Sequence, residues 1–183
     1  MKTPFTGDEV EKASKKMSNN KSCGMDNIKA ELIKESPGSL HQLIADIYND
    51  TAKTGHFPEQ IVVGVLTPLQ KPGKAKGPPE NLRPIILLSV LRKILTICLL
   101  QRIWDRIKAR IPLNQAAYQG GRSTTEHVYA IKTICEKAIT SNNYTLHLLL
   151  LDMSKAFDTV LRDKLLEKLE KIIHPDEIHL LSS

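Results

Sequence analysis

The chain has 183 residues, of which 41% are hydrophobic, and this is enough for one ordinary domain with a cooperative core. Three widely spaced cysteines, Cys23, Cys98 and Cys135, form no Cys-x-x-Cys, which argues against a disulfide framework or a zinc site and favours a reduced intracellular setting. The N-terminus lacks the apolar core of a signal peptide, and Arg92 and Lys93 interrupt the longest apolar stretch, so no membrane span is expected.

Basic residues gather in the middle third of the chain. The formal net charge of +6 is a moderate excess and would be a weak argument for an acidic partner by itself. Between Lys53 and Arg110, however, eleven basic residues are opposed by only three acidic ones, while the rest of the chain is close to neutral. This region is therefore the expected contact for a polyanion.

The first third of the chain predicts three helices. Thr6 or Asp8 can cap a first helix that continues to about residue 17. Asp26 can cap a second helix, which Pro37 ends. A strongly amphipathic third helix is expected from about residue 40 to Gly55.

Two short strands are predicted on either side of a loop rich in proline, glycine and lysine. Residues 61–66 are rich in β-branched side chains, and a second strand is expected around residues 82–86. The loop over residues 71–79 lies between them. This arrangement predicts a β hairpin with a basic tip.

The remaining elements alternate between helices and one strand. A long helix is expected over about residues 89–110, and Ser123 or Thr124 can cap the next one. Residues 145–151 are apolar on both faces, as in a strand covered by helices, and a charged helix follows over residues 161–172. Helices with few strands predict a helix-rich α+β fold.

The apolar run 145–151 ends in the most informative pattern of the chain, Asp152-Met-Ser-Lys-Ala-Phe157-Asp158. By pattern alone, Asp152 is about as readily a helix cap after a buried strand as a metal ligand. The pattern Asp-x-x-x-Ala-Phe-Asp resembles the first catalytic motif of reverse transcriptases, particularly those of non-LTR retrotransposons. This resemblance implies that Asp152 is a catalytic residue and metal ligand, and that the Met153 carbonyl also binds metal.

The same resemblance places Phe157 beneath the incoming sugar, where it excludes a 2′-hydroxyl. A packed core residue is the alternative for Phe157, and Asp158 is more simply a local cap. Phosphoryl transfer by polymerases requires divalent cations, and hard cations prefer carboxylate oxygens. The implied cofactor is therefore Mg²⁺, with Mn²⁺ as an alternative.

The basic hairpin resembles the two strands of the polymerase fingers that close over the nucleoside triphosphate. The resemblance implies that Lys71 and Arg83 contact phosphates, for which lysine supplies a point charge and arginine a planar fork. Lys74 and Lys76 are expected to contact the template backbone, although a solvated charge run is the more ordinary interpretation of these two. The pattern Asn81-x-Arg-Pro-Ile supports the resemblance through its position after the loop.

Residues 115–126 resemble the Gly-Phe-Arg-x-Gly-Arg-Ser-Thr segment of non-LTR and group II intron enzymes. Ser123 opens a helix whose N–H groups can receive a nucleic-acid phosphate, and Arg122 adds charge there. Gln119 stands where many relatives have arginine, which leaves one contact without its charge. Residues 21–28 resemble the segment that opens the fingers, and their role is expected to be structural.

The resemblance extends in order from residue 21 to residue 158 and implies the fingers and incomplete palm of a right-hand polymerase. Residues 1–140 would form the fingers and the start of the palm, and residues 141–183 the first catalytic strand with its following helix. The sequence has no two adjacent aspartates, so the family's Tyr/Phe-x-Asp-Asp hairpin is absent from it. Apolar surface beside residues 148–151 is therefore expected to be exposed.

The leading hypothesis is a portion of an RNA-directed DNA polymerase that uses an RNA template, a DNA primer and deoxynucleoside triphosphates. No membrane is expected among its partners. The chain alone is expected to be inactive and to need the missing palm and thumb or a partner chain. The alternative is a decayed or co-opted remnant that binds nucleic acid without catalysis, and a purely structural interaction domain is less favoured. An intracellular location is expected, and the resemblance implies the nucleus.

Overall fold

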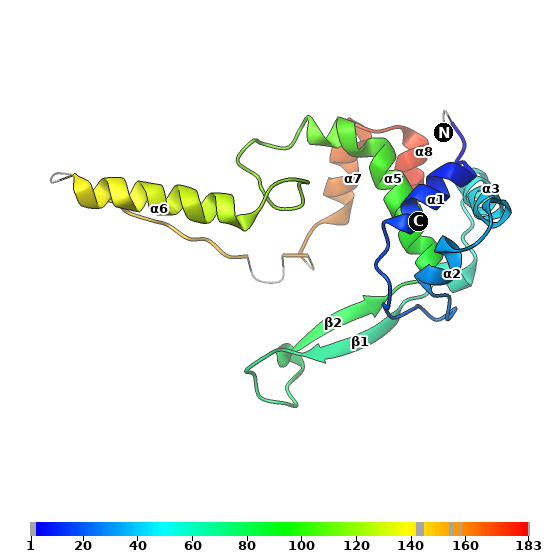
Figure 1. Ribbon diagram of the computed structural model, residues 1–183, viewed down its shortest axis with the longest axis horizontal. Coiled ribbons are helices and arrows are strands. Elements are labelled where there is room, and N and C mark those ends of the chain that lie inside the picture. The colour runs from blue at the N-terminus through cyan, green and yellow to red at the C-terminus, as the bar shows by residue number, and fades with distance from the viewer. Residues whose placement is uncertain (1–2, 142–144, 154–155, 158, 183) are drawn as a thin grey trace. The chain divides into compact units, whose positions relative to one another are not determined.

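The computed structural model describes residues 3–141, 145–153, 156–157 and 159–182. Their elements are, in chain order, α1 (Gly7–Lys15), α2 (Ala30–Lys34), α3 (Gly38–Thr54), α4 (Glu59–Val62), β1 (Val65–Gln70), η1 (Pro79–Asn81), β2 (Leu82–Leu87), α5 (Val90–Lys108), α6 (Thr124–Thr140), α7 (Arg162–Glu170) and α8 (Pro175–Ser182). The predicted helix-rich α+β class is confirmed, and the sheet found among these residues is the two-stranded hairpin β1–β2 (Figure 1). No helix in the described part of the chain is both long and apolar enough to cross a membrane.

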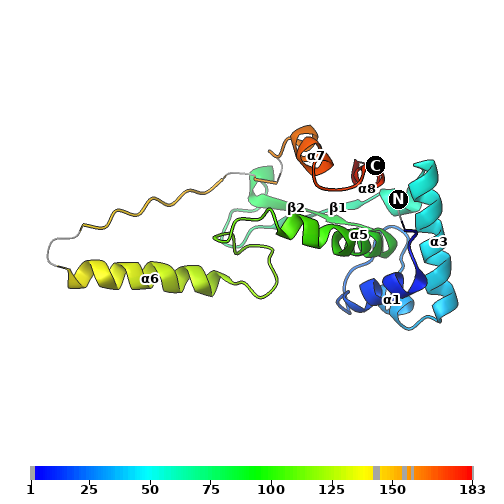
Figure 2. The same cartoon turned by 90° about the horizontal axis from the view of Figure 1, so that it is seen from above.

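The chain divides into two compact units. The first comprises Met1–Arg106 with Leu166–Ser183, and the second comprises Ile107–Leu165. The first unit has a helical core to which α1, α2, α3, α5 and α8 contribute, and α1 and α3 pack directly on each other (Figure 2). The core contains Phe5, Val10, Ala13, Ala30, Ile33, Ile44, Ala45, Tyr48, Val90, Ile94, Leu95, Cys98, Leu99 and Leu180.

Tyr48 is a fully buried member of this core. Its hydroxyl donates a hydrogen bond to the Leu91 carbonyl at 2.6 Å, and its ring meets Phe5 edge to face at a centroid distance of 5.8 Å. Burial raises the pKa of the Tyr48 hydroxyl, and burial also raises the pKa of the neighbouring Cys98 thiol to about 12. Both groups therefore stay neutral and act in packing.

Arg102 joins the N-terminal segment to α5. Its guanidinium donates to both carboxylate oxygens of Glu9, at 2.8 and 2.6 Å. It also donates to the carbonyls of Thr3 and Pro4, both at 2.8 Å, and lies 4.1 Å from the centre of the Phe5 ring. Burial acts to raise the pKa of Glu9, but hydrogen bonds, chiefly from Arg102, outweigh it and lower that pKa. Arg102 and Glu9 thus form a charged, hydrogen-bonded ion pair.

Several helix ends follow their sequence signals. Thr6 caps α1 in a capping box with Glu9, and Gly55 ends α3 in the left-handed region at a φ of 72°. Ser123 precedes α6, and its backbone N–H donates to Glu126 at 3.3 Å. The predictions for these three ends are confirmed, because each depends on interactions within one turn of helix.

The prediction that Asp26 caps the second helix is wrong. Helix α2 begins after Lys29, whereas the Asp26 carboxylate accepts hydrogen bonds from the Ile28 N–H at 3.1 Å and from the Ser89 hydroxyl at 2.6 Å. The Asp26 carboxylate thus accepts from a residue two positions away and from one 63 positions away, and it caps no helix. Gly24 also lies against this point, since a Cβ there would come within 2.6 Å of the Ser89 backbone nitrogen.

Substitution of Gly24 by alanine is expected to lower the free energy of unfolding by about 2 kcal/mol, because the added methyl group would meet unyielding backbone. Urea denaturation of the variant measures this. Gly38→Ala is the matched control, since a Cβ at Gly38 meets nothing within 4 Å, and it should leave stability unchanged or raise it. Equal midpoints for the two variants would show that Gly24 is not packed on the backbone of Leu88 and Ser89.

Two further boundaries differ from the sequence prediction, and one helix was not predicted. The predicted strand over 61–66 is instead the short helix α4 followed by β1, because a turn of helix after Pro58 buries Ile61. The predicted last helix ends earlier, at Glu170, and α8 was not predicted. Helix α8 carries Leu180 into the core, and its Glu177 accepts hydrogen bonds from Arg106 at 2.7 and 2.9 Å.

Candidate nucleotide-binding hairpin and catalytic segment

Strands β1 and β2 place two predicted phosphate contacts on one face of the hairpin. The strands pair antiparallel, with Leu69 opposite Arg83 and Gln70 opposite Leu82. Directly opposite side chains share a face, as do side chains two positions apart on one strand. Lys71 follows Leu69 by two positions, and its N–H continues the ladder by donating to the Asn81 carbonyl at 2.9 Å. Lys71 and Arg83 therefore lie on the same face as diagonal neighbours.

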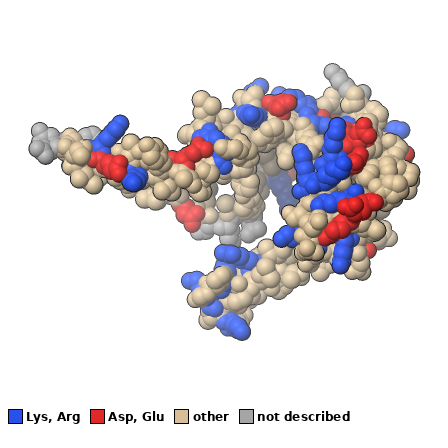
Figure 3. All heavy atoms as spheres, in the orientation of Figure 1, with Lys and Arg blue, Asp and Glu red and all other residues tan. Residues whose placement is uncertain are grey.

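The tip of the hairpin is cationic. Lysine and arginine side chains gather over the β1–β2 hairpin in the lower part of Figure 3. Lys74, Lys76 and Arg83 are exposed, and none forms an ion pair or side-chain hydrogen bond within the described part of the chain. Lys71 is half-buried as a residue, and its ammonium donates to the Glu80 carbonyl at 2.6 Å. Three of the four predicted cations are thus free to bind an anion. Lys71 would have to give up its hydrogen bond to the Glu80 carbonyl in order to bind one.

Arg122 is engaged by its neighbours. Its Nε donates to the Glu126 carboxylate at 2.6 Å, and its Nη1 donates to the Leu113 carbonyl at 3.0 Å. The guanidinium thus stabilises the turn before α6. Ser123 is exposed at the start of this helix, as the capping pattern predicted.

The predicted catalytic strand is not formed. Residues 145–151 have no regular secondary structure, and the side chains of Leu149, Leu150 and Leu151 are 83–84% exposed. A strand needs a neighbour for its N–H and C=O groups, and no other segment within the described ranges pairs with this one. The expectation that apolar surface is exposed here is confirmed.

Asp152 follows this run and is exposed. Its carboxylate and the Met153 carbonyl are hard oxygen donors suited to Mg²⁺. The described residues contain no group of three or more histidine, cysteine, aspartate or glutamate side chains that could hold a metal ion. These two oxygens therefore fit the ion chemically but supply only part of a site. Asp158 lies outside the described residues.

Phe157 is not a core residue, since its side chain is 81% exposed. Its ring meets Tyr118 edge to face, at a centroid distance of 6.5 Å and an interplanar angle of 84°. Tyr118 adopts a φ of 62°, which is unusual for a bulky residue. The sequence analysis did not predict this contact, because the two residues lie in separate motifs and no local pattern links them.

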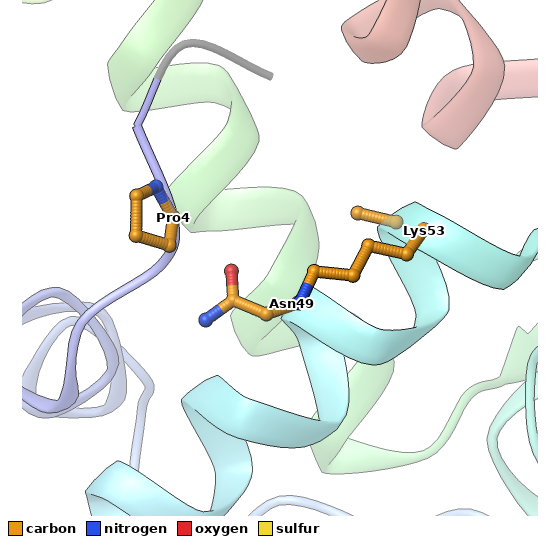
Figure 4. A pocket seen from close by; sticks show the side chains of 4 residues that line it. Pro4, Asn49 and Lys53 are labelled. Carbon is orange, nitrogen blue, oxygen red and sulfur yellow. The ribbon is translucent and has the colours of Figure 1, made fainter.

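A cavity of about 310 Å³ in the first unit is lined by Pro4, Asn49, Ala52 and Lys53 (Figure 4). The Asn49 amide already bonds the backbone of Phe5, accepting from its N–H at 2.6 Å and donating to its carbonyl at 2.9 Å. This leaves Lys53 as the polar group available to a ligand. The hairpin and the segment around Asp152 are thus the better candidates.

Comparison with known proteins identifies the family of this chain. A family model described as reverse transcriptase (RNA-dependent DNA polymerase) matches residues 69–182, which is more than half of the chain. The chain belongs to the reverse transcriptase family. The matched region of this reverse transcriptase segment begins in β1 and includes Lys71, Arg83, Arg122 and Asp152.

The relatives of this reverse transcriptase segment come from non-LTR retrotransposons. It is 32% identical over 92% of its length to a probable RNA-directed DNA polymerase from transposon BS of Drosophila melanogaster. It is 30% identical over 99% of its length to the corresponding X-element protein of the same species, and 26% identical over 98% to the jockey polymerase of Drosophila funebris. The chain spans about a fifth of the length of these relatives, covering 19–20% of each.

Proposed function

We propose that this reverse transcriptase segment is the fingers and first palm portion of an RNA-directed DNA polymerase, and that its hairpin binds the triphosphate of the incoming nucleotide. The observation that carries the proposal is the shared face of Lys71 and Arg83, together with free cations at the tip. Catalysis of phosphoryl transfer depends on positioning and on neutralising phosphate charge. An ammonium and a guanidinium on a rigid ribbon are suited to both tasks.

The other predicted roles follow from the same family. An RNA template, a DNA primer and deoxynucleoside triphosphates are the proposed partners, with Lys74, Lys76, Arg122 and Ser123 along the nucleic-acid backbone. Asp152 and the Met153 carbonyl would hold Mg²⁺, which supplies charge neutralisation when bound. Phe157 would exclude the ribose 2′-hydroxyl. Catalysis also requires the carboxylates of the family's Asp-Asp hairpin, so the chain by itself is proposed to be inactive.

Binding of a deoxynucleoside triphosphate to the 183-residue chain, measured by isothermal titration calorimetry at low salt, tests the hairpin's role. Arg83→Ala should raise the Kd about tenfold, because it removes a charge-assisted contact of roughly 1.5 kcal/mol. Lys12→Ala, an exposed lysine on α1, is the control and should leave the Kd unchanged. The proposal fails if the wild-type chain shows no saturable binding, or if both variants lose affinity equally.

The second candidate is a remnant that binds nucleic acid without catalysis, and the free side chains of Lys74 and Lys76 favour it. Such a chain would bind single-stranded oligonucleotides with an affinity that falls steeply as salt rises. It would show no preference for a nucleoside triphosphate. Titration of both ligands under the same conditions separates the two functions.

A further inference from the structure

The side chain of Gln70 lies among carbonyl oxygens of the loop that joins β1 to β2. Its Nε2 lies 3.5 Å from the carbonyl oxygen of Lys71, 3.2 Å from that of Lys74, 3.3 Å from that of Ala75 and 3.4 Å from that of Asn81. The two N–H donors of one amide group thus lie within 3.5 Å of four backbone acceptors and are shared among them. Because Gln70 points to the face opposite Leu69, the loop bends toward this second face of the ribbon.

Two further side chains hold carbonyls of the same loop. The Asn81 amide donates to the Ala75 carbonyl at 2.9 Å, and the Lys71 ammonium donates to the Glu80 carbonyl at 2.6 Å. Gly73 and Gly77 supply the left-handed backbone that this path requires, with φ values of 70° and 112°. The carbonyls of the loop are therefore drawn inward onto side-chain nitrogens.

The opposite edges of these peptide groups are left free. In a trans peptide the C=O of one residue and the N–H of the next point in opposite directions, and no cis peptide occurs in the described part of the chain. Since the Lys74 and Ala75 carbonyls face Gln70, the N–H groups of Ala75 and Lys76 point away from it. Neither N–H donates a hydrogen bond within the described residues. Successive free N–H groups of this kind form anion-binding concavities.

We propose that Gln70 is the positioning residue of a phosphate-binding loop: it gathers the loop carbonyls on one side and so presents the N–H groups of Ala75 and Lys76, beside the Lys74 ammonium, to a phosphate group. The proposal rests on the proposed function of the hairpin and deepens it. Preorganised donors bind an anion without the cost of ordering the loop at that moment. Without the Gln70 amide, these carbonyl oxygens would face one another with no donor between them, and the loop would lose this conformation.

The test is to titrate the 183-residue chain with deoxythymidine triphosphate and, separately, with a single-stranded thymidine oligonucleotide, while the backbone amides are observed by NMR. In the wild type, the amide signals of Ala75 and Lys76 should shift on saturation. Gln70→Met, which keeps the side-chain length without its donors, should weaken binding about tenfold and abolish these two shifts. A response to the triphosphate alone assigns the site to the nucleotide, and one to the oligonucleotide alone assigns it to backbone phosphate.

Gln101→Met on α5 is the matched control, since Gln101 is exposed and makes no side-chain hydrogen bond within the described residues. It should leave the Kd and both shifts unchanged. If the wild type binds a ligand but Gln70→Met binds it equally, or if the Ala75 and Lys76 amides do not respond, the inference about Gln70 is overturned while the hairpin's proposed function stands. A wild type that binds neither ligand overturns both.

Discussion

Asp152→Ala is expected to lower RNA-directed DNA synthesis on the order of 10³-fold or more, because it removes a hard oxygen donor from the place where phosphate charge develops. Binding of a primer–template should change by less than about threefold, since Asp152 does not belong to the basic surface that attracts nucleic acid. Primer extension and filter binding measure the two effects. The assays require a polypeptide that joins residues 1–183 to the remaining polymerase segments of a family member.

Asp163→Ala is the control for this experiment. Asp163 is exposed in the first turn of α7, so its loss should leave synthesis within about twofold of the wild type. A parallel loss of synthesis and primer–template binding in Asp152→Ala would indicate a structural role for Asp152. Unchanged synthesis would remove it from the catalytic residues.

Arg102→Ala is expected to lower the free energy of unfolding by about 3 kcal/mol, at the lower end of the range for breaking a buried ion pair. The lower end applies because the Glu9 side chain is 31% exposed, although that of Arg102 is only 14% exposed. The variant removes the Arg102 donors from Glu9 and from two backbone carbonyls, and it removes the cation from the Phe5 ring. Urea denaturation followed by circular dichroism measures the loss.

One further substitution separates charge from geometry at Arg102, and another is the control. Arg102→Lys keeps the charge but cannot present a fork to two carboxylate oxygens and two carbonyls, so it should recover only part of the stability. Arg83→Ala removes an exposed arginine without side-chain partners and should change stability by less than about 0.5 kcal/mol. Equal midpoints for Arg102→Ala and Arg83→Ala would show that the N-terminal segment does not depend on Arg102.

Local interactions account for what the sequence predicted correctly. The cap at Thr6, the helix end at Gly55 and the hairpin all depend on residues close together in the chain, and all are present. The errors have tertiary causes. The Asp26 carboxylate accepts a hydrogen bond from the distant Ser89, and residues 145–151 have no strand beside them in the described structure. A pattern of side chains cannot reveal whether such a partner is present.

The candidate site shows the same contrast between what local patterns predict and what depends on the folded chain. The resemblance singled out Lys71 and Arg83, and the register of β1 and β2 then put them on one face. No pattern marked Gln70, because its importance comes from four carbonyls that only the folded loop brings together. The contact between Tyr118 and Phe157 likewise depends on the path of the backbone between distant residues.

The place of α8 in the core has a consequence for biosynthesis. Leu180 belongs to the same buried cluster as Phe5, and Glu177 reaches Arg106 across 71 positions of sequence. A ribosome delivers α1, α3 and α5 well before it delivers α8, so the nascent chain must keep part of their apolar faces uncovered until nearly all of this segment has emerged. Translational pausing between α5 and α8 should therefore lengthen the time during which this polypeptide depends on chaperones.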